Sequence, residues 1–137
     1  MSPILLATAL AMRTRTIRIG FSVLVLPLFE PIRLAEEIAT LEVLSEGRLD
    51  LGICRGNTSR YFEAWGLDYD DRSAAFDAVY ERLIRYWTEP QVEVGSCIGS
   101  IEPKCVQRPH PPIYVATHRE EGSTASFPPR LRPLSLC

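Results

Sequence analysis

The chain has 137 residues and a formal net charge of −2, with 46% hydrophobic and 23% charged residues. This length suits one domain with a modest core, and the composition is that of a soluble globular protein. Basic and acidic residues are interleaved, so the chain lacks the clustered basic face that binding to nucleic acid requires. The longest apolar stretch, residues 23–29, is far too short to cross a bilayer, and the N-terminus does not have the pattern of a signal peptide.

Cysteine usage indicates reduced thiols. The four cysteines form neither a C-x-x-C pair nor the spacing of a disulfide scaffold: Cys54, Cys97, Cys105 and Cys137. With only two histidines in the chain, a zinc site with Cys and His ligands is not expected. We therefore predict a cytoplasmic protein without a bound metal.

The first half of the chain predicts two helices that alternate with two strands. Ser2 and Pro3 are typical of a helix start, and apolar residues then recur at helical spacing to about residue 13. Residues 17–26 begin with alternation and end in a β-branched run, which is typical of a strand buried on both faces. Pro31 opens a second helix, which ends near Gly47.

The next segments continue this alternation. Residues 49–54 are predicted to form a second buried strand, and residues 57–71 are predicted to form a loop that carries several aromatic side chains. Asp70 or Asp71 can cap the clearest amphipathic helix of the chain, which Pro90 ends.

Strands separated by helices favour a parallel sheet covered by helices, which is an α/β fold class. Residues 91–112 are rich in glycine, serine and proline, with a short strand predicted at residues 92–94, and residues 113–116 form a third core strand. Helical and strand periodicity end after residue 116. We predict one domain over residues 1–116 and a disordered tail over residues 117–137.

The segment from Gly47 to Gly56 contains the best candidate for a ligand site. Arg55 follows the strand of residues 49–54, and ligands of parallel α/β sheets bind beyond the carboxyl ends of the strands. A guanidinium there can bind a phosphate through two parallel hydrogen bonds, and Gly56 lacks the side chain that would block close approach. The alternative is that Arg55 forms an ion pair with a nearby carboxylate. From residue spacing alone, this alternative is slightly favoured over the phosphate site.

Cys54 has two interpretations. It can be a thiol near a ligand whose pKa is lowered by the adjacent cation of Arg55, or a small residue of the core, which is the more common case. Strand alternation places the two side chains on opposite sides, so at most one of them faces the open side of the sheet.

Several blocks, taken in order, resemble one family. They are RTRTIRIG at residues 13–20, VLPL at 25–28, PIRLAEE at 31–37, LSEGRL at 44–49, GICRG at 52–56, FEAWG at 62–66, WTE at 87–89 and VQRPHPPI at 106–113. Together they look like the bacterial-luciferase-like, FMN- or F420-dependent monooxygenases and reductases. The segment around Cys54 is also similar to the luciferase α subunit. The resemblance runs from about residue 2 to residue 116.

The resemblance implies a TIM (β/α)8 barrel with the flavin at the carboxyl ends of the strands. It implies a monooxygenase that uses O2 and reduced FMN, supplied by a flavin reductase, on an organic substrate, within a family whose members are commonly dimers. The alternatives are an F420-dependent oxidoreductase that transfers hydride and a non-catalytic flavin-binding or interaction protein. Because the cofactor performs the chemistry, the protein supplies orientation and water exclusion.

The resemblance also implies roles for particular residues, although it identifies no catalytic residue. By this alignment Arg55 contacts the cofactor phosphate and is followed by the matching glycine. The other positions that match cofactor-binding residues of the family are Gly56, Cys54, Leu26 and Pro27 near the flavin, and Thr117 and His118 near the phosphate.

The chain departs from the family pattern in four places. Phe29 and Glu30 stand where relatives usually have a histidine, and Ala75 and Ala78 align with a frequent arginine and glutamate. The alignment contains about three βα units, without the first two strands and their acid-and-histidine segment. A partial barrel has open sheet edges, and we expect it to expose Val, Leu and Ile on one sheet face. We also expect the chain alone to be marginally stable or misfolded, to bind FMN weakly if at all, and to be too short for activity on its own.

Overall fold

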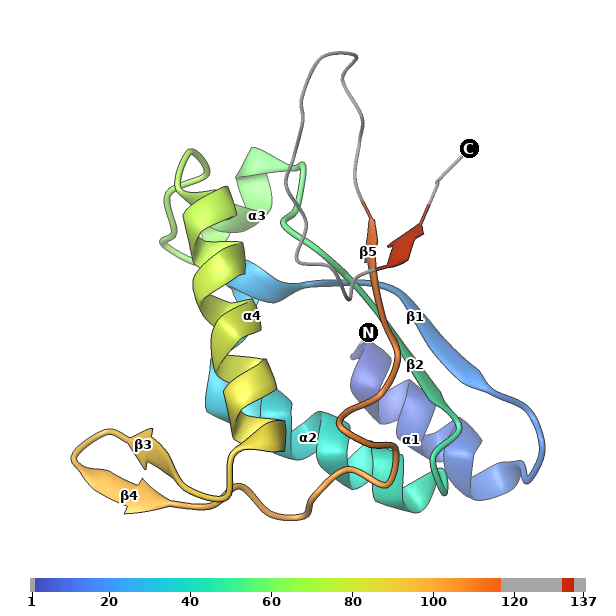
Figure 1. Cartoon of the computed structure of the whole chain (residues 1–137). Helices are drawn as coiled ribbons and strands as arrows, with labels where there is room; N and C mark the ends of the chain where they lie inside the picture. Colours follow the sequence, from blue (N-terminus) through green and yellow to red (C-terminus); the bar gives the residue numbers. More distant parts are fainter. Residues whose placement is uncertain (1, 117–131, 135–137) are drawn as a thin grey trace.

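The computed structural model describes residues 2–116 and the backbone of residues 132–134. Figure 1 shows the order of its elements. These are α1 (Pro3–Arg13), β1 (Ile19–Val25), the 3-10 turn η1 (Leu26–Leu28), α2 (Pro31–Leu44), β2 (Leu49–Cys54), α3 (Ser59–Ala64), α4 (Arg72–Thr88), β3 (Val92–Val94), β4 (Cys97–Gly99), β5 (Ile113–Ala116) and β6 (Arg132–Leu134).

The main sheet has the order β1-β2-β5-β6, and all three pairings are parallel. This confirms the predicted α/β fold class with three parallel core strands. β6 is an addition, because we expected residues 117–137 to have no regular structure. The other residues of that predicted tail, 117–131 and 135–137, lie outside the described part of the chain.

The hydrophobic core lies between the sheet and its helices. Every second strand residue is buried against α1, α2 and α4: Ile19, Phe21, Leu24, Leu49, Leu51, Ile53, Ile113 and Val115. Because strand side chains alternate between the two faces, the intervening residues point away from the helices. α2 packs against both α1 and α4, so the helices form one layer over one face of the sheet.

The expectation that the other sheet face exposes Val, Leu and Ile holds only in part, for valine. Among strand residues with described side chains, that face is mostly small or polar, with Gly20, Ser22, Asp50, Gly52, Cys54, Tyr114 and Ala116. Val23 and Val25 are half-buried there. In the main sheet the isoleucine, leucine and phenylalanine side chains of β1, β2 and β5 face the helices, and the exposed large apolar side chains lie outside this sheet, several of them on α1.

β1 is irregular in its middle. Its pairing with β2 shifts register between Phe21 and Leu24, and the peptide bond between Ser22 and Val23 is cis. The carbonyl oxygen of Phe21 lies over Gly52 of β2, where a Cβ atom would overlap it. A glycine at this position of β2 is therefore required by the backbone of β1.

The helix ends follow the chemistry expected from the sequence. Ser2 caps α1, accepting a hydrogen bond from the backbone N–H of Leu5 at 3.4 Å, and Pro3 and Pro31 occupy the first turns of α1 and α2. After α2, Gly47 has φ of +76° and its N–H donates to the carbonyl of Glu42 at 3.0 Å. This backbone conformation favours glycine and ends the helix.

Arg48 joins three segments through backbone carbonyls. Its guanidinium donates to the carbonyl oxygens of Ala11, Thr14, Ile17 and Ser45 at 2.7–3.1 Å and to the Thr14 hydroxyl at 3.1 Å. These bonds tie the C-terminal end of α1 and the loop before β1 to the start of β2. The arginine of the block at residues 44–49 therefore has a structural role.

The irregular segment before β5 is held at two points. The buried carboxylate of Glu42 accepts hydrogen bonds from the backbone N–H and the side-chain amide of Gln107, at 3.0 and 2.9 Å. The ammonium of Lys104 donates to the carbonyls of Tyr86 and Glu89 at the end of α4. The antiparallel hairpin of β3 and β4 projects away from the rest of the molecule (Figure 1).

Candidate cofactor-binding site

Arg55 immediately follows β2 and is exposed at the carboxyl edge of the sheet. β1 and β5 run parallel to β2, so their carboxyl ends lie at the same edge. Val25, the last residue of β1, pairs with Cys54, the last residue of β2. The structure therefore confirms the predicted location of Arg55 beyond the end of a parallel strand.

The guanidinium of Arg55 is not neutralised by a carboxylate among residues 2–116. Its one described side-chain contact is a hydrogen bond from Nη1 to the hydroxyl of Ser73 at 3.3 Å. Arg18, which precedes the amino end of β1, differs because it forms a bidentate pair with Asp50 at 2.7 and 2.8 Å. The alternative of an ion pair at a strand end thus describes Arg18, whereas Arg55 has no carboxylate partner among residues 2–116.

Gly56 is crowded by side chains of the protein, and its expected role beside a cofactor stays a prediction. Its φ is +86°, and a Cβ atom would lie 2.8 Å from Cγ1 of Val25 and 2.9 Å from Cε2 of Phe62. These atoms belong to the protein itself. The absent side chain therefore allows α3 to pack closely against the end of β1.

Cys54 is half-buried on the sheet face that the helices leave uncovered. Burial raises the pKa of its thiol, and the hydrogen bond with the Gly56 backbone lowers it by less. The hypothesis that the cation of Arg55 lowers this pKa is wrong, because desolvation of the thiolate dominates. Cys54 is also only partly buried, so it is not a fully packed core residue.

Leu26 and Pro27 lie in η1, directly after β1, and both are buried. Leu26 belongs to the hydrophobic core, so its side chain packs against protein atoms. Thr117 and His118, the other two predicted cofactor residues, lie outside the described residues. The structure thus brings Leu26 and Pro27 to the same edge as Arg55 and leaves the phosphate role of residues 117 and 118 a prediction.

Sequence reasoning missed two features of this edge. The predicted loop of residues 57–71 contains the six-residue helix α3, too short for helical periodicity to reveal. Phe62 of α3 is buried and meets the ring of Tyr69 edge to face at 5.4 Å between centroids. Ser73 and Arg55 are 18 positions apart in the sequence, so no local sequence pattern could predict the hydrogen bond between them.

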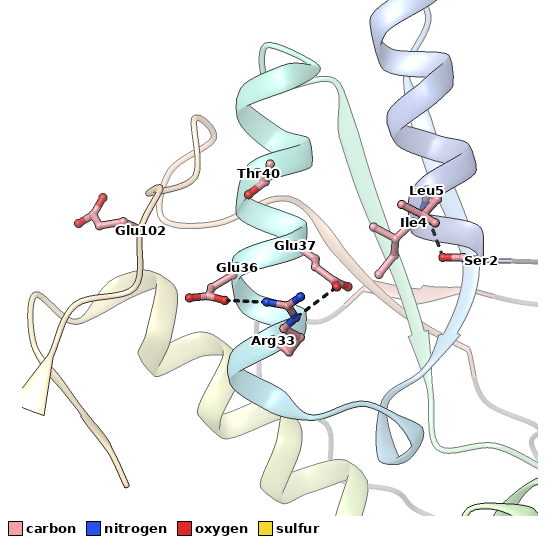
Figure 2. A pocket seen from close by; sticks show the side chains of 8 residues that line it. All are labelled: Ser2, Ile4, Leu5, Arg33, Glu36, Glu37, Thr40 and Glu102. Carbon is pink, nitrogen blue, oxygen red and sulfur yellow. Dashed lines mark hydrogen bonds and ion pairs between the residues drawn. The ribbon is translucent and has the colours of Figure 1, made fainter. Parts of the chain in front are cut away.

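A separate hollow of about 550 Å³ lies on the helix side of the sheet. Figure 2 shows its lining on α1, α2 and the loop before β5, with Arg33 extended toward Glu36 and Glu37 at 3.9 and 3.7 Å. These pairs are largely exposed, and none of the lining residues lies in a strand. The hollow is therefore distinct from the edge that carries Arg55.

A parallel sheet covered by helices on one face, with an arginine at its carboxyl edge that no carboxylate of residues 2–116 neutralises, defines an α/β protein of the kind whose ligands commonly bind where the strands end. Comparison of the sequence with family models is more specific. The model described as luciferase-like monooxygenase matches residues 1–125, so the chain belongs to the luciferase-like monooxygenase family. The match continues past residue 116, where we expected the resemblance to end.

Characterised relatives agree with this assignment. The chain is 32% identical to the oxygenase component of flavin-dependent trigonelline monooxygenase from Acinetobacter baylyi, over 84% of this chain and 34% of the relative. It is also 32% identical to the alkanal monooxygenase alpha chain of Photorhabdus luminescens, over 92% of this chain and 36% of the relative. The chain thus spans about a third of the length of these curated relatives.

Solved structures show the same fold. The monooxygenase RslO1 from Streptomyces bottropensis superposes with a TM-score of 0.77 and 34% identity, over 85% of this chain and 37% of that protein. The coenzyme F420 dependent tetrahydromethanopterin reductase of Methanopyrus kandleri, at 21% identity, has a TM-score of 0.69 over 85% of this chain and 39% of the reductase. The present chain forms a partial barrel of this type. Among its described residues, no helix is long and apolar enough to cross a membrane.

Proposed function

We propose that this chain carries the phosphate-binding edge of a flavin site in a monooxygenase that uses reduced FMN and O2 on an organic substrate. The observation that carries the proposal is the exposed guanidinium of Arg55 beyond β2, without a carboxylate partner among residues 2–116. Membership of the luciferase-like monooxygenase family supports the flavin as the cofactor. We retain as a proposal the domain of residues 1–116, to whose sheet β6 adds a further parallel strand.

The residues at this edge fit a nucleotide phosphate. An arginine has five N–H donors in a planar fork, and the one described side-chain contact uses a single nitrogen. The remaining donors suit two oxygens of one phosphate. Reduced flavin, when bound, supplies the electrons that activate O2, while Arg55 orients the cofactor by its anionic end.

The sheet face next to Arg55 fits a planar ring system. The residues at this end of the face are small, with Ala116 at the end of β5 and the half-buried Cys54 at the end of β2. We propose that Cys54 and the end of β1 at Leu26 and Pro27 lie near the flavin ring. Thr117 and His118 are proposed as further phosphate contacts by analogy with the family.

The partners follow from the same proposal. The trigonelline enzyme is named as an oxygenase component, and on this analogy a separate flavin reductase supplies reduced FMN to the protein of which this chain is part. Association into homodimers and a cytoplasmic location are further proposals, the second based on cysteine spacing.

Two other functions have support. An F420-dependent hydride transfer is favoured by the structural likeness to the F420-dependent reductase. A non-catalytic flavin-binding or interaction protein is compatible with a partial barrel. Binding of FMN but not F420 would exclude the first, and turnover with reduced FMN, O2 and candidate substrates would exclude the second.

The decisive experiment compares FMN with riboflavin, which lacks the phosphate. We expect the chain to bind FMN more tightly, and Arg55→Met to weaken FMN binding by about 10- to 100-fold because charge-assisted hydrogen bonds are lost. Fluorescence titration measures both ligands. Arg60→Met, which removes another exposed arginine nearby, is the matched control and should change neither affinity.

Equal affinity of the unmodified chain for FMN and riboflavin would contradict the proposal. So would an Arg55→Met variant that keeps the preference for FMN. Circular dichroism of each variant shows that the fold is retained, which is expected because the Arg55 side chain is exposed.

A further inference from the structure

We infer that Ser73 is the second side-chain donor of the phosphate site and also positions Arg55, an inference that rests on the proposed function. Ser73 is the second residue of α4, and its Oγ lies 3.3 Å from Nη1 of Arg55. Both side chains are exposed at the carboxyl edge of the sheet. The hydrogen bond joins the end of β2 to the start of α4.

The direction of this hydrogen bond is set by chemistry. A guanidinium has no acceptor, so Arg55 donates and the Ser73 hydroxyl accepts. The hydroxyl proton therefore stays available, and no other hydrogen bond of this hydroxyl occurs among residues 2–116. A phosphate bound to Arg55 would lie next to an O–H group that can donate to one of its oxygens.

The neighbouring residue Arg72 cannot take this role in the observed conformation. Its Nη1 donates to the carbonyl of Tyr69 at 2.9 Å, and its guanidinium lies 4.0 Å from the centre of the Tyr69 ring. Asp70 is a further partner at 4.0 Å. Arg72 is thus held against the preceding loop, and Ser73 is the α4 side chain that reaches Arg55.

Arg55 and Ser73 together suit a terminal phosphate better than the guanidinium of Arg55 alone would. Arg55 contributes planar N–H groups, and the Ser73 hydroxyl approaches from the adjacent helix, so the two groups can reach different oxygens of one phosphate monoester. Fixing the guanidinium in advance also lowers the entropy lost when the ligand binds. The ligand class is the phosphate end of a flavin mononucleotide.

The test measures FMN and riboflavin binding by fluorescence for the full chain with Ser73→Ala and Ser73→Thr. Because one hydrogen bond is removed, Ser73→Ala should weaken FMN binding about three- to tenfold and leave riboflavin binding unchanged. Ser73→Thr keeps the hydroxyl and should restore most of the affinity. Ser96→Ala, an exposed serine in the β3–β4 turn, is the matched control and should have no effect.

The outcomes separate this inference from the proposed function. If Arg55→Met abolishes the preference for FMN while Ser73→Ala does not change it, the role of Ser73 is refuted and the phosphate site stands. Equal weakening of FMN and riboflavin by Ser73→Ala would indicate a structural effect and also refute it. If Arg55→Met has no effect, the proposed function fails first.

Discussion

At the carboxyl edge, two independent constraints require glycine at position 56: its backbone conformation and the crowding around its Cα atom. Its φ of +86° lies in the left-handed region, and its missing Cβ would meet Val25 and Phe62 at under 3 Å. Gly66, just after α3, has a similar φ of +69° but open space around the missing Cβ. The two positions therefore separate the cost of the backbone conformation from the cost of crowding.

We predict that Gly56→Ala lowers the free energy of unfolding more than Gly66→Ala does. The second substitution should cost about 1–2 kcal/mol from left-handed backbone strain alone. The first should add about 1–3 kcal/mol, because the methyl group displaces Val25 or α3. Urea denaturation of both variants measures the difference, and equal losses would show that the packing of α3 on β1 is loose.

At the scale of elements, Arg48 holds several segments together through hydrogen bonds to backbone carbonyl oxygens and not through an ion pair. Its donors satisfy carbonyls at the C-terminal end of α1, where helices leave acceptors without intrahelical partners. The cation is also favourable next to the negative end of the α1 dipole. α1, the loop before β1 and the start of β2 thus depend on one side chain.

We expect Arg48→Met to destabilise the chain by about 2–4 kcal/mol, because the half-buried hydrogen bonds to the carbonyls of Ala11, Thr14 and Ser45 lose their charged donor. Arg33→Met is the control, since Arg33 is 73% exposed and its ion pairs are long. It should change stability by less than about 1 kcal/mol. Similar effects of the two substitutions in urea denaturation would contradict the anchoring role of Arg48.

At the scale of the whole molecule, α1 has more apolar surface than the core covers. It buries Ile4, Ala7 and Ala11, yet several other apolar side chains are exposed: Leu5 at 73%, Met12 at 57%, Leu6 at 46% and Leu10 at 43%. A helix that is apolar on most sides is typical of the interior of a larger protein or of an interface. We therefore expect the chain to self-associate through α1.

The double variant Leu5→Lys/Met12→Lys should shift sedimentation velocity profiles toward monomer, because it places two charges on one exposed flank of α1. Lysine has a high helix propensity, so the helix should persist. Ile98→Lys is the control, since Ile98 is also 73% exposed but lies in the projecting hairpin. A chain that is already monomeric at all concentrations would rule out association through α1.

The sequence by itself predicted the elements that depend on local periodicity and on the chemistry of helix ends. The largely apolar segment of residues 49–54 predicted β2 and its end before Arg55, and Ser2 and Gly47 lie at the helix ends as expected. α3 was missed because six residues are too few for a helical pattern. β6 was missed because three residues are too few for the alternation of a strand to be recognised.

The location of Arg55 was thus predictable, but its partner was not. Periodicity reports on neighbours two to four positions apart, whereas the contact with Ser73 spans 18 positions and depends on how α4 packs on the sheet. The same limit applies to Gly56. A larger residue is excluded there by Val25 of β1 and Phe62 of α3, which the local sequence does not reveal. Tertiary packing alone decided which groups surround the guanidinium and that no carboxylate of residues 2–116 neutralises it.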